Sequence, residues 1–166
     1  MGNYAADIEI WRATAAELET AFGLVEEYFA RAVVVSRESR EKFAEEYFGR
    51  GRGFWLARLD GQLAGCIGLR AFRRVSEDNC RTESCAEIKR MYVREIFRGQ
   101  GIAQKLLEAA ERFARDAGYD WIYLDTTNQM RAAARLYERN GYEQCGRYND
   151  NPQATIFMRK KLLFAV

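Results

Sequence analysis

The alternation of apolar and polar positions is clearest over residues 102–117, where it predicts an amphipathic helix. Apolar residues recur there at a period of about 3.6 residues, and charged residues take the opposite face. Gly118 follows, and glycine readily adopts the left-handed conformation that ends many helices. Residues 87–93 before the helix and the apolar run 121–126 after it are predicted strands, the second one buried on both faces. The whole stretch therefore predicts a βαβ unit.

Capping and turn residues predict further elements on both sides of this unit. Thr14 begins a helix with Glu17 in a capping box, and Ser36 or Ser39 begins the next one. Asp60-Gly61 is a strong hairpin signal. In chain order the other predicted elements are a strand at 8–13, helices at 14–29 and 36–48, strands at 54–59 and 62–72, a loop at 73–84, a helix at 129–139 capped by Asn128, and strands at 142–148 and 155–162. This order predicts a mixed sheet with helices packed on it.

Two glycines stand directly before the helix of the βαβ unit, in the sequence Arg98-Gly99-Gln100-Gly101-Ile102-Ala103. Glycine lets the backbone come close to a bound group, and the first N–H groups of the helix point at the same place. The positive end of the helix dipole lies behind them, so such a turn favours an anion. The turn therefore predicts a phosphate or pyrophosphate site.

The first strand of the βαβ unit carries the charged residues Glu87, Lys89 and Arg90, although it should be central and apolar. Charges inside a sheet line a cavity or pair with one another. One interpretation is therefore an internal ion pair or an exposed strand face. The other is that the Glu87 carboxylate faces a cleft beside the glycine turn and accepts a proton.

Composition excludes several classes of protein. The chain has 166 residues, of which 48% are hydrophobic and 30% charged, as in one ordinary globular domain. A net charge of +2 is too small to indicate a nucleic-acid binder. The four cysteines form no C-x-x-C pair and there is no histidine, which argues against a zinc site or a histidine-based triad. Since no long apolar run is present, we expect a cytoplasmic protein with reduced thiols and no membrane contact.

Two blocks of sequence resemble the GNAT superfamily of acyl-CoA-dependent N-acetyltransferases. Arg98-x-x-Gly101-x-Ala103 resembles the family signature Q/R-x-x-G-x-G/A. Residues 133–142, Ala-Ala-Arg-Leu-Tyr-Glu-Arg-Asn-Gly-Tyr, resemble the second conserved block of the family. With the strand before the turn, these blocks cover residues 87–142. Many members have proline near the start of the turn, where this chain has Glu95.

The resemblance implies one N-acetyltransferase domain over residues 1–166. It implies an α/β (α+β) fold, with a mixed, mostly antiparallel sheet of about six to seven strands and about four flanking helices. A central parallel pair of strands would splay around the cofactor. The implied reaction transfers an acetyl group from acetyl-CoA, the cosubstrate, to a primary amine by direct attack, without a metal. The expected partners are a small-molecule amine or a peptide or protein amine and, as an option, a second copy of the chain, but no nucleic acid.

The resemblance also assigns roles to particular residues. Tyr137 would protonate the departing thiolate, and Glu87 would take the proton of the amine through water. The Met91 N–H would polarise the thioester carbonyl. The residues implied to bind the cofactor are Met91, Tyr92, Val93, Arg98, Gly99, Gln100, Gly101, Ile102, Ala103 and Asn128. The alternative for Tyr137 is a core aromatic on the stripe formed with Met130, Ala133 and Ala134.

Rival interpretations stay open at this point. A dinucleotide-binding unit would also place Gly99 and Gly101 before a helix and Asp125 at the end of the next strand, although Gln104 stands where it needs a third glycine. An acyl-CoA-binding sensor without activity would keep the same fold. Nothing identifies the acceptor. Arginines that could hold an acceptor carboxylate or phosphate, or simply form a solvated basic loop, are Arg70, Arg73, Arg74 and Arg81.

Overall fold

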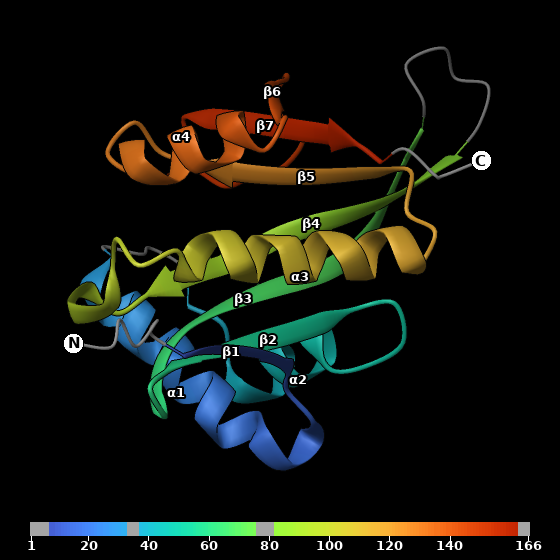
Figure 1. The fold of residues 1–166 in the computed structure, drawn as a ribbon. Helices are drawn as coiled ribbons and strands as arrows, with labels where there is room; N and C mark the ends of the chain where they lie inside the picture. Colours follow the sequence, from blue (N-terminus) through green and yellow to red (C-terminus); the bar gives the residue numbers. More distant parts are fainter. Residues whose placement is uncertain (1–6, 33–36, 76–81, 163–166) are drawn as a thin grey trace.

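A seven-stranded sheet forms the centre of the computed structural model, which describes residues 7–32, 37–75 and 82–162 (Figure 1). The strand order is β1-β2-β3-β4-β5-β7-β6. Only β4 and β5 pair in parallel among these strands, so the expected mixed, mostly antiparallel sheet is confirmed. The strands are β1 (Ile8–Arg12), β2 (Gly53–Leu59), β3 (Gln62–Val75), β4 (Thr82–Val93), β5 (Trp121–Thr126), β6 (Glu143–Gln144) and β7 (Ile156–Lys161).

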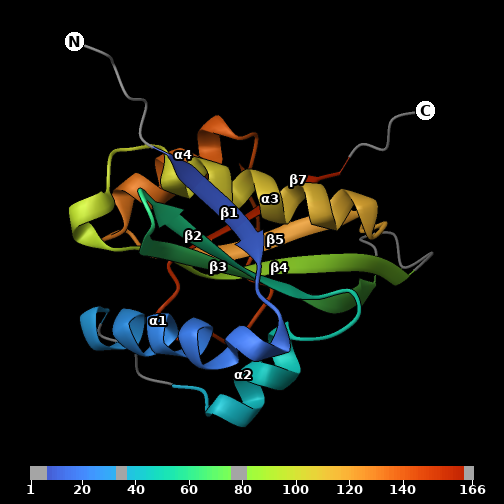
Figure 2. The same ribbon diagram turned by 60° about the horizontal axis from the view of Figure 1, so that its bottom comes forward.

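Helices cover both faces of this sheet. Figure 2 shows α1 and α2 on one side of it and α3 on the other. The helices that the described residues form are α1 (Leu18–Arg31), α2 (Arg40–Tyr47), α3 (Ile102–Asp116) and α4 (Arg131–Arg139), with short 3-10 turns η1 (Ala15–Glu17) and η2 (Glu95–Phe97). The structure thus has the expected helices, arranged as a three-layer domain.

The predicted apolar face of α3 packs into the core. Leu106, Leu107 and Ala110 are fully buried against Ile67 and Leu69 of β3, while the charged side of the helix is exposed. A second apolar cluster lies between the other face of the sheet and the first two helices, with Leu24, Phe43 and Phe54 among its buried members. Apolar burial on both faces explains why β2 and β5 are nearly continuous apolar runs.

Local signals in the sequence predicted the helix starts and the hairpin. The Thr14 N–H donates to Glu17 Oε2 at 2.9 Å, as a capping box requires. Ser39 caps α2, because its Oγ accepts from the Lys42 N–H at 3.2 Å, whereas Ser36 lies outside the described residues. Asp60 and Gly61 both have positive φ, 47° and 77°, as a two-residue hairpin turn of this kind needs.

Three boundary predictions are wrong. The predicted strand at 142–148 is reduced to β6, because the chain then turns away and places Tyr148 against the sheet. The predicted loop at 73–84 belongs partly to β3 and β4, whose pairing continues to Val75 and Thr82; residues 76–81 lie outside the described part. Asn128 does not cap α4, because that helix starts only after Met130.

The sheet opens between its two parallel strands. β4 pairs with β5 only over Cys85–Ile88 and Trp121–Leu124, although β4 itself continues to Val93. The two strands diverge beyond this point, at the left in Figure 1. The glycine turn and the start of α3 follow β4 directly, so the opening and the predicted phosphate site lie at the same end of the sheet.

Candidate functional site

A β-bulge in β4 lies at the opening. Arg90 and Met91 together oppose the single residue Ile67 of β3, and Arg90 has a positive φ of 58°. A residue other than glycine in this conformation costs about 1–3 kcal/mol, so its surroundings must hold it. Arg90 Nε donates to Glu38 Oε1 at 2.8 Å, and the guanidinium lies 5.0 Å from the centre of the Phe29 ring.

The backbone of β4 presents N–H groups to the opening. The Arg94 N–H donates to the Ala64 carbonyl of β3 at 2.8 Å. Successive N–H groups of a strand point to opposite sides, so the N–H groups of Val93 and Met91 face away from β3. Pairing with β5 has already ended at Leu124, which leaves these groups at the opening.

The glycine turn provides further donors. Gly99 and Gly101 have φ of 75° and 83°, and a Cβ atom at either position would meet nothing within 4 Å. The conformation, not crowding, therefore calls for glycine. Helical bonding begins with the Lys105 N–H on the Gly101 carbonyl, so the N–H groups of residues 102–104 have no partner in the helix. Arg98 Nε binds the Val93 carbonyl at 3.0 Å and ties the turn to β4.

Tyr137 lies on α4 in the apolar core that also contains α3. Its side chain is 5% exposed, and its ring packs edge-on against Tyr142 with a centroid distance of 5.6 Å. Burial raises the pKa of Tyr137, and the nearby Tyr28 and Asp125 raise it further. Within the described part of the chain its hydroxyl makes no hydrogen bond. The ring thus packs in the core as one interpretation predicted, and the raised pKa keeps the hydroxyl protonated at neutral pH.

Glu87 is buried in a network of charges on the sheet face opposite α3. Its Oε2 accepts from Arg70 Nε at 2.7 Å, and its Oε1 lies 3.1 Å from Lys89 Nζ. Tyr148 and Asn149 also donate to Oε1, at 2.9 and 3.1 Å. Burial opposes ionisation, but the positive charges of Lys89 and Arg70 outweigh it and lower the pKa of Glu87. The internal ion pair predicted as one interpretation of this strand is confirmed.

Asp125 extends this network to β5 and to the segment after β6. Lys89 Nζ lies 2.5 Å from its Oδ2. Asn149 Nδ2 donates to the same oxygen at 2.5 Å, and Asn151 Nδ2 donates to Oδ1 at 3.1 Å. Burial raises the pKa of Asp125, but Lys89 and the two amides outweigh this and lower it. Arg70 continues the network at its other end to Glu46 of α2, at 2.7 Å.

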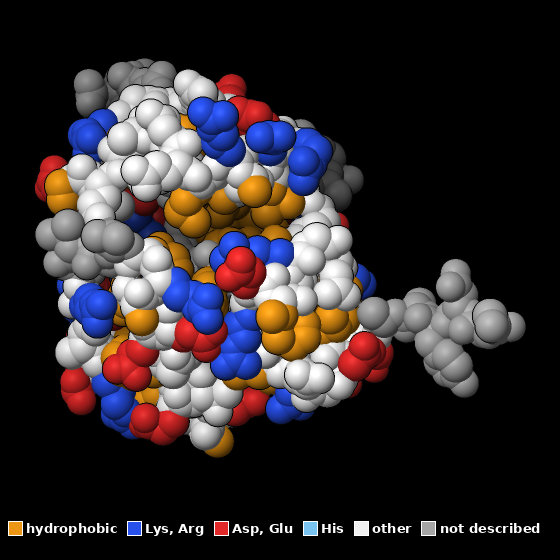
Figure 3. Space-filling model, turned by 90° about the vertical axis from the view of Figure 1, so that its left-hand side faces the viewer, with side chains coloured by type: hydrophobic (Ala, Val, Ile, Leu, Met, Phe, Trp, Pro, Cys, Tyr) orange, Lys and Arg blue, Asp and Glu red, His pale blue; other side chains and the backbone are white. Residues whose placement is uncertain are grey.

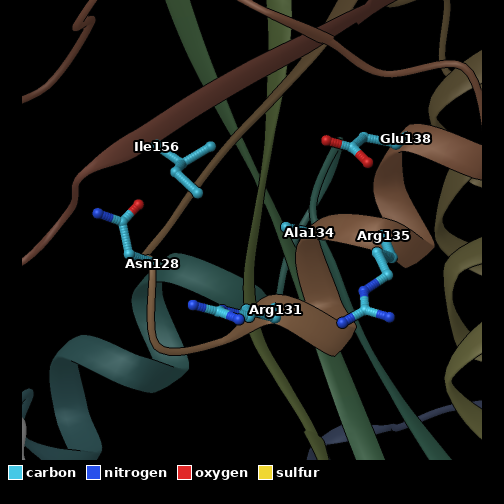
Figure 4. A pocket seen from close by; sticks show the side chains of 6 residues that line it. All are labelled: Asn128, Arg131, Ala134, Arg135, Glu138 and Ile156. Carbon is cyan, nitrogen blue, oxygen red and sulfur yellow. The ribbon is translucent and has the colours of Figure 1, made fainter.

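A pocket of about 390 Å³ lies beside α4 (Figure 4). Its lining residues are Asn128, Arg131, Ala134, Arg135, Glu138 and Ile156. In the close view Arg131 points toward the Asn128 side of the helix and Arg135 points away from it. Among the predicted site residues only Asn128 lines this pocket.

The surface is hollowed at the end of the molecule where β4 and β5 diverge. Figure 3 shows this hollow lined with hydrophobic side chains, with Lys and Arg side chains along its upper rim. An apolar hollow with a basic rim fits a ligand that has an apolar arm and phosphate groups.

The structure brings some of the predicted residues together and separates others. Residues 91–93 and 98–103 lie around the opening, whereas Glu87 lies deep in the charge network. Arg70 is engaged by two carboxylates and is not a free anion-binding group; the side chains of Arg73 and Arg74 and all of Arg81 lie outside the description. Sequence reasoning missed the joint role of Asp125, Asn149 and Asn151. The only signal was the pair of asparagines two positions apart, a pattern that favours consecutive Asx turns.

Comparison with known proteins agrees with this architecture. The sequence profile of the acetyltransferase (GNAT) family matches residues 17–142. Rat N-acetylaspartate synthetase is 35% identical over 126 residues, 74% of this chain and 40% of that protein. The Escherichia coli N-acetyltransferase YjgM is 28% identical over 113 residues, 68% of this chain and 64% of that protein. This chain thus spans between 40% and 64% of the length of these two relatives.

Solved structures share the fold over nearly the whole chain. A GNAT-family acetyltransferase from Staphylococcus aureus Mu50 superposes with a TM-score of 0.74 at 21% identity, covering 95% of this chain and all of that one. The Salmonella typhimurium acetyltransferase yncA, solved with acetyl-CoA, superposes with a TM-score of 0.73 at 16% identity, covering 96% of both chains.

These findings define a mixed-sheet domain whose parallel pair opens beside the glycine turn at the start of α3. The chain belongs to the acetyltransferase (GNAT) family. The sheet also excludes the dinucleotide-binding alternative, which requires a mostly parallel sheet, whereas one parallel pair is present in the described residues. None of the helices in the described ranges has the length and apolar character that a membrane span requires.

Proposed function

We propose that this protein is an N-acetyltransferase that uses acetyl-CoA and acetylates a primary amine by direct attack in a ternary complex. One observation carries the proposal. β4 leaves β5 after Ile88, beside the glycine turn that begins α3, so backbone donors without a strand partner and the N–H groups of this turn border the same opening. Family membership and the acetyl-CoA bound to the related yncA support the choice of cosubstrate.

The residues around the opening suit the separate parts of this cosubstrate. We assign the pyrophosphate to the backbone of residues 98–103, where the turn and the helix start supply N–H donors. The exposed backbone of residues 91–93 would pair with the amide groups of the pantetheine arm, as one strand pairs with another. Asn128, which we predicted would contact that arm, precedes α4 and lines the pocket beside that helix. Acetyl-CoA supplies the acetyl thioester.

The proposed reaction needs no covalent intermediate. The amine nitrogen forms a bond to the thioester carbon, the carbon–sulfur bond breaks, and the sulfur leaves as a thiolate. The Met91 N–H stabilises the negative charge that develops on the carbonyl oxygen, a contribution worth about 10²–10³ in rate in other enzymes. Tyr137 donates its phenolic proton to the sulfur and regains a proton from solvent, which has received the proton of the amine. The raised pKa of Tyr137 keeps it protonated before the reaction.

Glu87 is the proposed acceptor of the amine proton, through water. Its lowered pKa keeps it ionised at neutral pH, so it favours the approach of an ammonium group. A carboxylate of this kind binds a proton only weakly. Its role in the proposal is therefore to pass the proton to solvent and not to store it.

The acceptor is proposed only as a class, a primary amine of a small molecule, a peptide or a protein. The name N-acetylaspartate synthetase makes amino acids with a second carboxylate a sensible part of an acceptor screen. The rival proposal is an acyl-CoA-binding sensor without activity, which the retained Tyr137 and Glu87 disfavour.

A turnover assay separates the two proposals. The protein is incubated with acetyl-CoA and a panel of amines that includes amino acids, polyamines and N-terminal peptides, and free thiol release is measured. We expect release that depends on one class of amine and on the amount of protein. Tight binding of acetyl-CoA without amine-dependent release across the panel would instead support the sensor.

A further inference from the structure

The segment 145–155, between β6 and β7, is built from two consecutive Asx turns. The Asn151 N–H donates to Asn149 Oδ1, and the Gln153 N–H donates to Asn151 Oδ1, both at 3.1 Å. Arg147 stiffens the segment further by donating to the Asn151 carbonyl at 3.0 Å and to the Ala154 carbonyl at 3.2 Å. The segment therefore holds its own shape through contacts within itself.

The two asparagine side chains connect this segment to the sheet. Each amide oxygen is used in an Asx turn, so the Nδ2 groups are the ends that reach outward. Both reach Asp125, at 2.5 Å for Asn149 and 3.1 Å for Asn151. Asn149 also reaches Glu87, but Glu87 has Arg70, Lys89 and Tyr148 as further partners. Asp125 is thus the carboxylate that both Asx turns share.

Asp125 also lies where the sheet opens. The last registered pair between β4 and β5 is Ile88 with Leu124, and the next residue on each strand is Lys89 and Asp125. Their side chains form an ion pair with an Nζ–Oδ2 distance of 2.5 Å. A pair of side chains therefore continues the contact between the strands at the point where backbone pairing stops.

The network also shows on which face the segment lies. Ile88 and Leu124 point into the core shared with α3, so their neighbours Glu87, Lys89 and Asp125 point to the opposite face. The segment 145–155 covers that face, and Tyr148 stacks on Phe72 there with a centroid distance of 5.7 Å. If the cosubstrate takes the α3 side, the amine must approach from the side that this segment borders.

We propose that Asp125 is a positioning residue that holds the segment 145–155 against β4 and β5 and thereby sets the affinity for the acceptor amine. The inference rests on the proposed function, because it needs an acceptor. It assigns Asp125 no direct contact with the cosubstrate. Loss of its charge should loosen the segment from the sheet while the Asx turns within the segment persist.

The test compares Asp125→Asn with the control Asp120→Asn. Asp120 directly precedes the same strand and accepts from the Ser84 N–H at 2.9 Å, at the end of the strand away from the opening. For the Asp125 variant we expect the KM of the amine found in the acceptor screen to rise about tenfold, as for losing one hydrogen bond to a charged group. Amide hydrogen exchange over 145–155 should become faster, and the Kd of acetyl-CoA by calorimetry should stay within a few-fold. The control should change neither the KM nor the exchange in that segment.

A second variant covers the case in which Asp125→Asn fails to fold. Asn151→Asp keeps the Oδ1 acceptor of the Asx turn, replaces the amide that donates to Asp125 by a second carboxylate, and leaves the ion pair with Lys89 in place. It should raise the amine KM and the exchange over 145–155 in the same direction. An unchanged amine KM in both variants, or a rise in the acetyl-CoA Kd equal to that in KM, would overturn the inference. If the parent protein acetylates no amine, the proposed function fails first, whereas unchanged exchange over 145–155 would reject the positioning role without any acceptor.

Discussion

Tyr137 combines a packing role with a group that can give up a proton. Its ring fills the core next to Tyr142, and its hydroxyl is free of hydrogen bonds to the described residues. Burial raises the pKa of Tyr137, so the phenol keeps its proton throughout the range in which amines react. Substitution by phenylalanine separates these roles, because it removes the hydroxyl and keeps the ring.

The Tyr137→Phe variant should therefore fold normally and turn over slowly. We expect kcat to fall about 10²-fold or more, because loss of a general acid typically costs that much. The Kd of acetyl-CoA should change by only a few-fold, since the lost interaction belongs to the transition state. Steady-state kinetics with the amine found in the screen, together with a melting curve, provide the measurement.

The defect in kcat should shrink as the pH approaches the pKa of the CoA thiol, because a thiolate then leaves without a proton. An undiminished kcat would leave Tyr137 only its packing role.

Glu87 contributes charge to the fold as well as to the proposed chemistry. Its folded-state pKa is lowered, so its ion pairs stabilise the fold above the ordinary pKa of glutamate, about 4.3, and this stabilisation is lost as the pH falls through the folded-state pKa. Breaking a buried pair by removing one charge typically costs about 3–5 kcal/mol.

The Glu87→Gln variant should consequently lose more stability relative to the parent at neutral pH than in acid. We expect its free energy of unfolding at pH 7 to be lower than that of the parent by about 3 kcal/mol. The deficit should shrink once the pH drops below about 4, because the parent then loses the same charge. Urea unfolding of variant and parent at pH 7 and at a pH below about 4 measures the difference in their free energies of unfolding. An equal difference at both pH values would show that the changed shape of the side chain, and not its lost charge, explains the lower stability.

At the scale of single elements, the turn between β4 and α3 depends on its backbone conformation. Gly101 has a φ of 83°, and there is open space around the position a Cβ would take. Alanine and glutamate there would share the same conformational cost, about 1–3 kcal/mol, and differ in their charge. A comparison of these two variants therefore isolates electrostatics from strain.

Gly101→Glu should lose CoA binding, whereas Gly101→Ala should retain much of it. The added carboxylate would lie among the N–H donors proposed for the pyrophosphate and repel it. Calorimetric titration with CoA measures both affinities, and melting curves confirm that the two variants are destabilised alike. Equal CoA affinities in the two variants would show that the pyrophosphate binds elsewhere.

The sequence predicts elements well where the signal is local. The bounds of β5 and the start of α3 at Ile102 follow from the apolar pattern, and Gly118 has a φ of 78°, as predicted for the end of that helix. The predicted strand after α4 is mostly irregular, because Tyr148 is drawn to Phe72 and Glu87. Alternation of polar and apolar residues carries no information about such contacts.

The candidate site, too, is predictable from the sequence only where its residues are adjacent in the chain. The glycine turn is visible because its residues are adjacent in the sequence, and its conformation needs glycine. The charge network is not visible, since Asp125 meets Lys89 across 36 positions and Asn149 meets Glu87 across 62. The excess of charge in β4 did indicate that something unusual is buried there, but the pattern alone could not name the partners.

At the scale of the whole molecule, a short parallel ladder joins two parts of the sheet. The antiparallel strands β1–β4 carry α1–α3, whereas β5, β7 and β6 form the other part with α4 (Figure 1). Backbone pairing between the parts is confined to Cys85–Ile88 and Trp121–Leu124. A ligand placed in the opening would contact both parts, so its binding should stabilise the domain against unfolding.

Acetyl-CoA should therefore raise the melting temperature of the protein. A ligand that binds only the folded state stabilises it by about 2.7 kcal/mol at 100 times its Kd, which corresponds to roughly 5–10 °C for a domain of this size. NADH and ATP share the phosphates and the adenine but lack the pantetheine arm, so each should produce a much smaller shift. The Gly101→Glu variant is the matched control and should show little shift with acetyl-CoA. A larger shift with NADH than with acetyl-CoA would contradict the proposed cosubstrate, and an acetyl-CoA shift that persists in the variant would contradict the proposed place of its pyrophosphate.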